Sequence, residues 1–410
     1  LCLASYSSGL QLKIEGQRNV RPGHELLRRV NMDGTVALSN TADLTYHTNL
    51  TLGGQLFTVQ IDTGSSDLWV AGNITDSIDT GKMSEIPYAK GAAGGPVKTS
   101  TLQIANYTVQ DQAFKSTVQV TPDSDHPTGI GLIGLGPTTG SVIYNNLTTS
   151  VGYTVLDRIF LQNTSTPNYL TVLLGRTQDP TDVFPGEISI GELLDGYSNV
   201  DCEPKLEVTI VPGDESIQQH FQILLDEDGI IGPDGKPIPI TTAVAQTSNS
   251  KQATAVLDTG FSFSQVPKSV ADAIYSGFSG AEYLNITGLG EVWIVPCDEE
   301  VNITFKFSGN SYHVHPLDAT MDPSLINLDL TDSTGQSYCA GSFQPFIFAP
   351  PFPTYDMILG MSFLRNVYAV FNYGDFVAGG NDTTIRGDPY VQLLSTTDPA
   401  EAHSDFVAVR

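Results

Sequence analysis

The sequence is poor in positive charge. Its 410 residues include 19 Lys and Arg against 45 Asp and Glu, which gives a formal net charge of −26 at pH 7. A surface of this sign repels polyanions, so nucleic-acid binding is excluded as a general function, and anionic membranes do not attract the chain. Only 16% of the residues are charged, whereas roughly 25% is typical of soluble domains. Such a surface suits acid conditions, because protonation of carboxylates reduces self-repulsion.

Long hydrophobic runs are also missing. No stretch of 18 uncharged apolar residues occurs, so we expect no membrane-spanning helix and no membrane insertion. Residues 1–5 are interpreted as the tail of a signal peptide. The number of Asn-x-Ser/Thr sequons exceeds the about three or four expected by chance, which favours a secretory route. The sequons begin at Asn49, Asn73, Asn106, Asn146, Asn163, Asn285, Asn302 and Asn381.

Cysteine is scarce, and the common metal and nucleophile motifs are absent. The four cysteines form no C-x-x-C pair, which favours one or two disulfides in an oxidising compartment over a zinc site. The sequence contains neither H-E-x-x-H nor G-x-S-x-G. It therefore lacks the zinc-binding motif of metallopeptidases and the nucleophile motif of serine hydrolases. His313 and His315 are either a metal pair on one strand face or exposed strand histidines, and no third ligand is evident. We expect no metal and no cofactor.

The remaining pattern is mostly β. From about residue 44 to 375, short apolar or alternating runs are separated by Gly, Pro, Asn and Asp, as in proteins built of many short strands. Helical periodicity is restricted to residues 267–278 and, more weakly, 155–162. Residues 226–236 read as a polar surface loop or hairpin. The length favours two large lobes.

One design occurs twice, 196 residues apart. An apolar strand runs into Asp62-Thr63-Gly64, and another runs into Asp258-Thr259-Gly260. Each is followed later by an apolar run that ends in glycine, at Gly134 and at Gly360. An ionisable residue at the end of a buried strand costs free energy in its apolar surroundings. Ionisable residues in such surroundings are typical of functional sites. A duplicated lobe explains this order, whereas two ordinary strand-end turns would not require it.

A third Asp-Thr-Gly, at Asp79, is interpreted differently. It follows polar residues and leads into Lys82, so we expect a surface turn without chemistry there.

On the two matched segments, the sequence resembles the pepsin-like aspartic peptidases of the secreted fungal type over residues 44–376. The resemblance implies a mostly β, bilobal pepsin-like fold, with pseudo-twofold-related lobes, a central cleft and a β-hairpin flap. It assigns residues 1–29 to a propeptide or leader remnant and 30–200 to the N-terminal lobe. Residues 201–395 are then the C-terminal lobe and 396–410 a C-terminal tail.

The resemblance also implies the catalytic residues. Asp62 and Asp258 would share one proton, because two close carboxylates do not both ionise readily, and would activate a water between them. Phe261 stands where the family usually has Ser or Thr, so Asp258 lacks a matching hydroxyl and the pH optimum is left open. The residues expected to support the pair are Thr63, Gly64, Ser65, Thr259 and Gly260.

A flap is expected around Tyr88, with Gly91 in the hairpin and Trp69 bonded to the tyrosine hydroxyl. The alternatives are a generic hairpin tyrosine and a plain core tryptophan. Lys90 would repel a Lys or Arg just before the cut bond, so Lys90→Asp should improve cleavage after Lys. The alternative is that Lys90 points into solvent and has little effect on specificity.

Processing and cross-linking complete the expectations. By resemblance, Cys297 and Cys339 form a disulfide, while Cys202 either joins Cys2 or is free. Residues 1–29 contain five basic and two acidic residues, so they would bind the acidic body at neutral pH. The dibasic site Arg28-Arg29 lies 33 residues before Asp62, and cleavage there would make Val30 the mature start.

The sequence therefore predicts a monomeric aspartic endopeptidase, secreted or vacuolar, that hydrolyses polypeptides at acid pH. It is expected to prefer large apolar residues flanking the cut and to be inhibited by pepstatin-type compounds. The alternative is a catalytically silent pepsin-fold binding or inhibitor protein.

Overall fold

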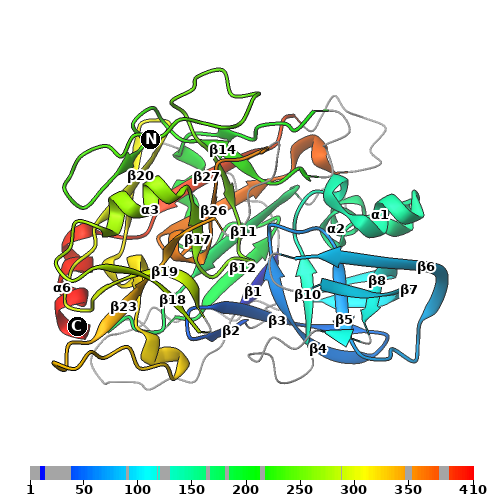
Figure 1. The fold of residues 1–410 in the computed structure, drawn as a ribbon. Coiled ribbons are helices and arrows are strands. Elements are labelled where there is room, and N and C mark those ends of the chain that lie inside the picture. The colour runs from blue at the N-terminus through cyan, green and yellow to red at the C-terminus, as the bar shows by residue number, and fades with distance from the viewer. Residues whose placement is uncertain are drawn as a thin grey trace.

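The computed structural model describes residues 10–13, 38–88, 92–117, 119–120, 130–162, 167–180, 184–212, 218–287, 289–346, 353–377 and 387–410. Within this part of the chain the fold is mostly β, as the sequence predicts, and the strands form several sheets (Figure 1). No described helix is long and apolar enough to cross a bilayer.

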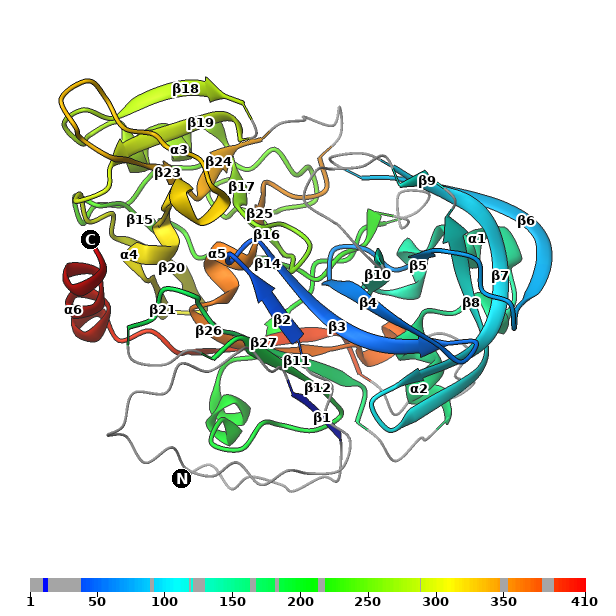
Figure 2. The same ribbon diagram turned by 90° about the horizontal axis from the view of Figure 1, so that it is seen from below.

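The N-terminal half is built on a nine-stranded sheet, drawn in blue to cyan in Figures 1 and 2. In one of its central strands residues 56–61 alternate between more exposed and buried side chains, and Phe57, Val59 and Ile61 point into the core. The strands are β2 (Leu38–Thr41), β3 (Thr45–Leu52), β4 (Gln55–Asp62), β10 (Ile130–Gly134), β5 (Leu68–Ala71), β8 (Tyr107–Thr117), β7 (Ala92–Ile104), β6 (Ile78–Pro87) and β9 (Gln119–Val120).

The C-terminal half contains three smaller sheets. The first, five-stranded, has the order β14 (Gln222–Leu224), β16 (Thr254–Leu257), β25 (Met357–Leu359), β17 (Ser264–Val266) and β24 (Phe343–Pro345). The second joins β15 (Ile230–Ile231), β20 (Ile303–Phe307) and β21 (Asn310–Val314). The third has the order β18 (Glu282–Ile286), β19 (Gly290–Pro296), β23 (Tyr338–Gly341) and β22 (Thr320–Met321).

A six-stranded sheet combines strands from both halves and lies between them in Figure 1. Its order is β1 (Leu10–Lys13), β12 (Gly186–Ile190), β11 (Tyr169–Leu174), β26 (Val367–Asn372), β27 (Tyr390–Ser395) and β13 (Leu206–Glu207). The central pair, β11 and β26, is antiparallel with Val172 opposite Ala369. Because β11 comes from the N-terminal half and β26 from the C-terminal half, this sheet ties the halves together.

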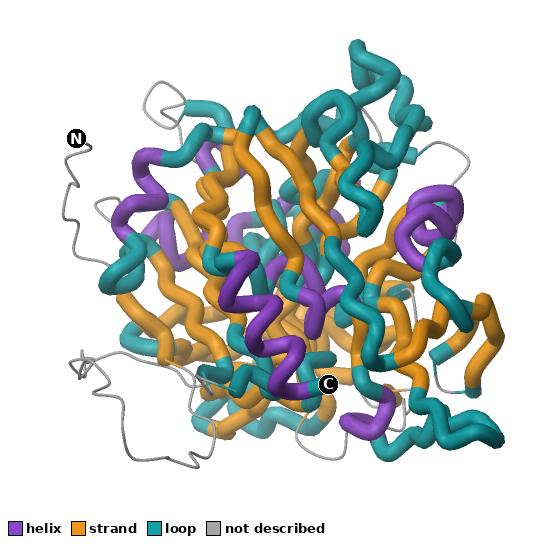
Figure 3. The backbone as a smooth tube through the Cα atoms, turned by 90° about the vertical axis from the view of Figure 1, so that its left-hand side faces the viewer, coloured by secondary structure: helices purple, strands orange, loops and turns teal. Residues whose placement is uncertain are grey.

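Both expected helices are present. In α3 (Lys268–Tyr275) Val270, Ala271, Ile274 and Tyr275 are buried, and α2 (Val155–Gln162) matches the weaker prediction. The other α-helices are α1 (Val142–Leu147), α4 (Pro316–Ala319), α5 (Met361–Leu364) and α6 (Pro399–Val409). The last occupies most of the expected C-terminal tail and is the purple helix that ends at C in Figure 3.

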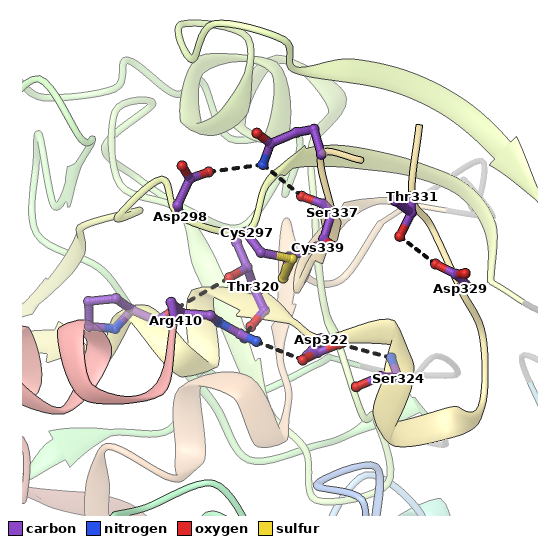
Figure 4. The surroundings of a disulfide bond; sticks show 12 residues. Cys297, Asp298, Thr320, Asp322, Ser324, Asp329, Thr331, Ser337, Cys339 and Arg410 are labelled. Carbon is purple, nitrogen blue, oxygen red and sulfur yellow. Dashed lines mark hydrogen bonds and ion pairs between the residues drawn. A yellow bond between two sulfur atoms is a disulfide. The ribbon is translucent and has the colours of Figure 1, made fainter. Parts of the chain in front are cut away.

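The expected disulfide is present. Cys297 and Cys339 are bonded, with Cα atoms 4.9 Å apart, and join the end of β19 to β23 (Figure 4). Beside this sheet, Arg410 at the end of α6 forms an ion pair with Asp322 at 3.1 Å. Cys202 is not a free thiol, whereas Cys2 lies outside the described residues.

The polar segment at residues 226–236 contains more structure than a plain loop. Ile230 and Ile231 form β15, which pairs with β20, and Ile230 is fully buried. Asp226 accepts hydrogen bonds from the backbone amides of Ser308 and Gly309. The segment is therefore a hairpin fixed to the C-terminal half.

Candidate active site

The two Asp-Thr-Gly segments occupy equivalent places in the two halves. β4 ends at Asp62 and runs parallel to β10, and β16 ends one residue before Asp258 and runs parallel to β25. The Leu135 amide donates to the Asp62 carbonyl at 2.7 Å, and the Asp258 amide donates to the Leu359 carbonyl at 3.0 Å. The repeat in the sequence is thus a repeat in the fold.

The two segments hold each other through their threonines. The amide of Thr63 donates to the hydroxyl of Thr259 at 3.0 Å, and the amide of Thr259 donates to the hydroxyl of Thr63 at 3.0 Å. Each hydroxyl then donates to the carbonyl before the other aspartate, that of Leu257 or Ile61. Both threonines are fully buried, so these four bonds form a symmetric link away from water.

The two glycines bring the carboxylates together. A Cβ atom at Gly64 would lie 2.0 Å from Oδ2 of Asp258, and one at Gly260 would lie 2.4 Å from Oδ1 of Asp62. Each aspartate therefore packs against the backbone of the opposite segment, where only glycine leaves room. Both aspartates are only 5% exposed.

The two carboxylates differ in their hydrogen bonds. The hydroxyl of Ser65 donates to Oδ2 of Asp62, and the amides of Gly64 and Ser65 donate to Oδ1. Burial raises the pKa of Asp62, while these bonds oppose the rise. Asp258 accepts from the amide of Gly260 at 2.6 Å. Burial, and then the charge of Asp62, raise the pKa of Asp258 well above its ordinary value.

Phe261 explains this difference. It occupies the position that corresponds to Ser65, and the next hydroxyl, that of Ser262, donates to the carbonyl of Leu44 instead. Asp258 thus has no bond equivalent to the Ser65 bond among the described residues. Asp258 is consequently the better place for a proton, and Asp62 the better place for a negative charge.

Tyr88 and Trp69 meet beside this pair. The indole Nε1 of Trp69 donates to the hydroxyl of Tyr88 at 2.9 Å, and that hydroxyl lies next to Ser65. Tyr88 packs against an apolar cluster of Trp69, Ala93 and Leu132. It directly follows β6, which forms an antiparallel hairpin with β7. Lys90 and Gly91, the other predicted flap residues, lie outside the described residues.

The third Asp-Thr-Gly does not form the expected turn. Asp79 is exposed within β6, where the register shifts between Asp79 and Lys82. Gly81 has φ +71°, and its amide donates to Oδ1 of Asp79. The motif is therefore a β-bulge, which a glycine permits in mid-strand.

The expectation of two exposed strand histidines is wrong, because His313 is half-buried and His315 is buried. His315 is 3% exposed, and its Nδ1 accepts from the amide of Leu317 at the start of α4. A side chain that caps a helix can be buried, and strand alternation does not reveal this role. His313 lies on β21 with Nδ1 2.9 Å from the hydroxyl of Thr304.

Sequence reasoning missed two groups near the site. His220, just before β14, packs edge-on against Tyr355 and faces the backbone of Gly64. Lys115 is fully buried, and its ammonium donates to the carbonyl of Ala93 at 3.0 Å. These contacts join distant segments, and neither residue belongs to a local motif.

Cavities with volumes of about 490 and 250 Å³ lie among the described residues. The larger is lined by residues such as Thr138, Tyr144 and Phe376, and the smaller by residues such as Gln222, Val244 and Thr354. Neither is lined by Asp62, Asp258 or Tyr88, so neither is the expected substrate cleft.

Comparison with known proteins agrees with this geometry. A family model described as "Eukaryotic aspartyl protease" matches residues 45–379. The chain is similar to major aspartyl peptidase 1 of Cryptococcus neoformans var. grubii, with 27% identity over 382 residues, covering 87% of this chain and 73% of that protein. Cathepsin E of Mus musculus is 26% identical over 371 residues, covering 83% and 81%. Vacuolar protease A of Aspergillus fumigatus is 26% identical over 368 residues, covering 84% and 80%. Since the family model spans both Asp-Thr-Gly segments and most of the chain between and around them, this chain belongs to the eukaryotic aspartyl protease family.

Proposed function

We propose that this chain hydrolyses internal peptide bonds of polypeptides at acid pH, with Asp62 and Asp258 as the catalytic pair. The observation that supports this most strongly is the reciprocal packing of each carboxylate against the opposite glycine. Two carboxylates held this way share a proton in acid, which provides a general base and a general acid in one site.

The different surroundings of the two aspartates suggest that Asp62 acts as the general base and Asp258 as the general acid. Ionised Asp62, stabilised by Ser65, removes a proton from a water between the carboxylates, and that water attacks the carbonyl carbon of the substrate. Protonated Asp258 donates its proton to the carbonyl oxygen, which gives a tetrahedral diol. The proton on Asp62 then passes to the amide nitrogen while ionised Asp258 takes a proton from one diol hydroxyl, and the C–N bond breaks to release a carboxylic acid and an amine. Charge is conserved at each step, and the pair returns to a single shared proton.

Tyr88 is the proposed flap tyrosine. Its bond to Trp69 fixes the ring beside Ser65 and Asp62. A hairpin that carries this ring over the pair excludes water from the bound peptide. Together with Trp69 and Leu132 it forms an apolar wall, which supports a preference for large apolar residues flanking the cut.

Hydrolysis of an acid-denatured protein at pH 3–4, with and without pepstatin, tests the proposal. The peptidase cleaves the substrate, and pepstatin blocks the cleavage. A silent pepsin-fold binding protein binds pepstatin or peptides without producing new termini, so mass spectrometry of the products separates the two functions.

Asp62→Asn and Asp258→Asn test the assignment of the pair. Each removes one member of the acid–base pair, so kcat should fall at least about a thousandfold while the fold persists. Asp79→Asn, in the third Asp-Thr-Gly, is the matched control and should retain wild-type activity. Turnover of either pair variant within tenfold of wild type would contradict the assignment.

The cellular setting is part of the same proposal. We infer a secreted or vacuolar monomer with lobes at residues 30–200 and 201–395. Six of the eight sequons lie in the described residues, and all six asparagines are exposed, as N-glycosylation requires. They are Asn49, Asn73, Asn106, Asn146, Asn285 and Asn302. Asn163 and Asn381 lie outside the described residues.

A further inference from the structure

His220 is held rigidly next to the catalytic segments. Its carbonyl accepts from the amide of Gln222 at 3.0 Å and from Nε2 of Gln219 at 2.8 Å. The carbonyl of the next residue, Phe221, accepts from the amide of Leu257, the residue before Asp258. The backbone of His220 is thus fixed to the strand that presents Asp258.

The imidazole has two partners. Its ring meets the ring of Tyr355 edge-on, with centroids 5.8 Å apart, and it faces the backbone carbonyl of Gly64. Gly64 itself lies against the carboxylate of Asp258 and donates to Asp62. His220 is half-buried, so part of its surface is open. Because Gly64 contacts both carboxylates, only one residue separates His220 from the catalytic pair.

Tyr355 is fixed as firmly as His220. The carbonyl of Thr354 accepts from Nε2 of Gln222 at 2.9 Å. On the other side, the carboxylate of Asp356 accepts from the amides of Ala243 and Thr254. The two rings therefore form one preorganised surface, defined here as the His220–Tyr355 wall, which connects the two halves at Gly64.

The charge of this wall depends on the imidazole alone. Burial, and then the charge of Asp258, raise the pKa of Tyr355 to about 12, so its hydroxyl stays neutral in acid. Burial lowers the pKa of His220 to about 4, while the Gly64 carbonyl opposes this. The other titratable groups on this side are Asp62 and Asp258, which lie beyond Gly64. The wall is therefore neutral at pH 5–6 and cationic at pH 3.

We propose that the His220–Tyr355 wall is a substrate-binding surface that rejects cationic substrate side chains when the imidazole is protonated. The inference rests on the proposed endopeptidase activity and adds to it a specificity that changes with pH. A protonated imidazole repels a Lys or Arg side chain bound against it, whereas a neutral side chain of similar length is unaffected.

The test compares pairs of peptides that differ only by Gln or Lys at one position, placed in turn at each of three positions on either side of the cut. The ratio of kcat/KM for the Gln peptide to that for the Lys peptide is measured at pH 3 and at pH 5.5. Titration of the catalytic pair changes kcat/KM for both peptides in the same way. Most of this change therefore cancels in the ratio. At one position the ratio should be about fivefold larger at pH 3 than at pH 5.5.

Two neutral variants, His220→Gln and His220→Phe, should make this ratio independent of pH, and the second keeps an aromatic contact with Tyr355. His403→Gln is the matched control, because His403 is an exposed histidine on α6, paired with Glu300, and should keep the wild-type behaviour. A wild-type ratio that does not change with pH at any position would overturn the inference. A ratio that still changes with pH in both His220 variants would also overturn it. If the wild type cleaves no peptide, the endopeptidase proposal itself fails.

Discussion

At the scale of single residues, the two halves of the site differ at one side chain. Ser65 donates to Asp62, whereas the corresponding Phe261 offers no donor to Asp258. A hydrogen bond to an ionised carboxylate favours that form, so its absence leaves Asp258 protonated to higher pH. The pH range of activity should therefore respond to this position more than to others.

We expect Phe261→Ser to move the basic limb of the kcat/KM profile to lower pH by about one unit. A serine hydroxyl stabilises ionised Asp258, so the pair loses its shared proton at lower pH, and one unit corresponds to about 1.4 kcal/mol. Initial rates between pH 2 and 7 measure this shift. Ser65→Ala is the complementary control, since it destabilises ionised Asp62 and should move the acid limb upward. A basic limb unchanged by Phe261→Ser would show that residue 261 does not influence the shared proton.

The sequence predicts this site well where the signal is local. Two Asp-Thr-Gly segments at the ends of apolar strands identify the pair and its supporting threonines, because spacing along a strand translates directly into geometry. His220 could not be identified in this way. Its partner Gly64 is more than 150 residues away in the chain, and a histidine outside a motif is compatible with many environments. The prediction for His315 fails for a different reason: its partner Leu317 is only two residues away, but strand alternation does not reveal a side chain that caps a helix.

At the scale of elements, β1 is an edge strand taken from the predicted propeptide. Its residues pair antiparallel with β12, with Leu10 opposite Ile190 and Lys13 opposite Glu187. The strand is the outermost strand of the six-stranded sheet that ties the halves together. Removal of residues 1–29 would therefore uncover one edge of that sheet.

Cleavage between Arg29 and Val30, a site outside the described residues, should make this strand removable. After acid activation we expect a new N-terminus at Val30, found by N-terminal sequencing. The basic fragment should dissociate more completely at low pH and high salt, because both weaken its attraction to the acidic body. Reduced and non-reduced samples show whether a disulfide through Cys202, which is not a free thiol, keeps the cleaved fragment attached. Active enzyme that still begins upstream of Arg28 would contradict this maturation.

The strands and both periodic helices agree with the sequence prediction, but α6 does not follow from periodicity. Its apolar residues do not gather on one face, and only Ala402 and Phe406 are buried. A local signal was nevertheless present, because Asp398 caps the helix by accepting from the amides of Ala400 and Glu401, with Pro399 in the first turn. For α6, the capping residues are therefore a better sequence signal than the hydrophobic pattern.

At the scale of the whole molecule, a buried ionic network joins the halves. Asp318 accepts from Arg176 and Arg365, both at 2.6 Å, and is 1% exposed. Arg365 also donates to the carbonyl of Asp43. Although burial opposes ionisation, the charges of Arg176 and Arg365 hold the pKa of Asp318 well below its usual range.

Asp318→Asn should lower the free energy of unfolding by about 3–5 kcal/mol, since it leaves two buried arginines without their common partner. A carboxylate with a depressed pKa stabilises the fold fully above the unfolded pKa of about 4 and loses this effect as the pH falls toward its native pKa. The difference between wild type and variant should thus be constant from pH 7 to about 4 and shrink below. Urea unfolding measures it.

Asp234→Asn is the matched control, because Asp234 pairs with Lys236 on the surface and should leave the urea midpoint unchanged. A loss for Asp318→Asn no larger than that of this control would show that the network does not hold the halves together.

The reciprocal threonine bonds have a consequence for the origin of the site. Every bond in that link is satisfied by its own mirror partner, so two identical lobes related by a true twofold axis could form it equally well. In such a homodimer both aspartates would have identical neighbours, and only thermal fluctuation would decide which one held the proton. When the two lobes are fused in one chain, their sequences no longer have to be identical. A residue beside one aspartate can then be substituted without the same substitution beside the other. The Ser65 and Phe261 positions show this broken symmetry, by which a single chain assigns acid and base to fixed places.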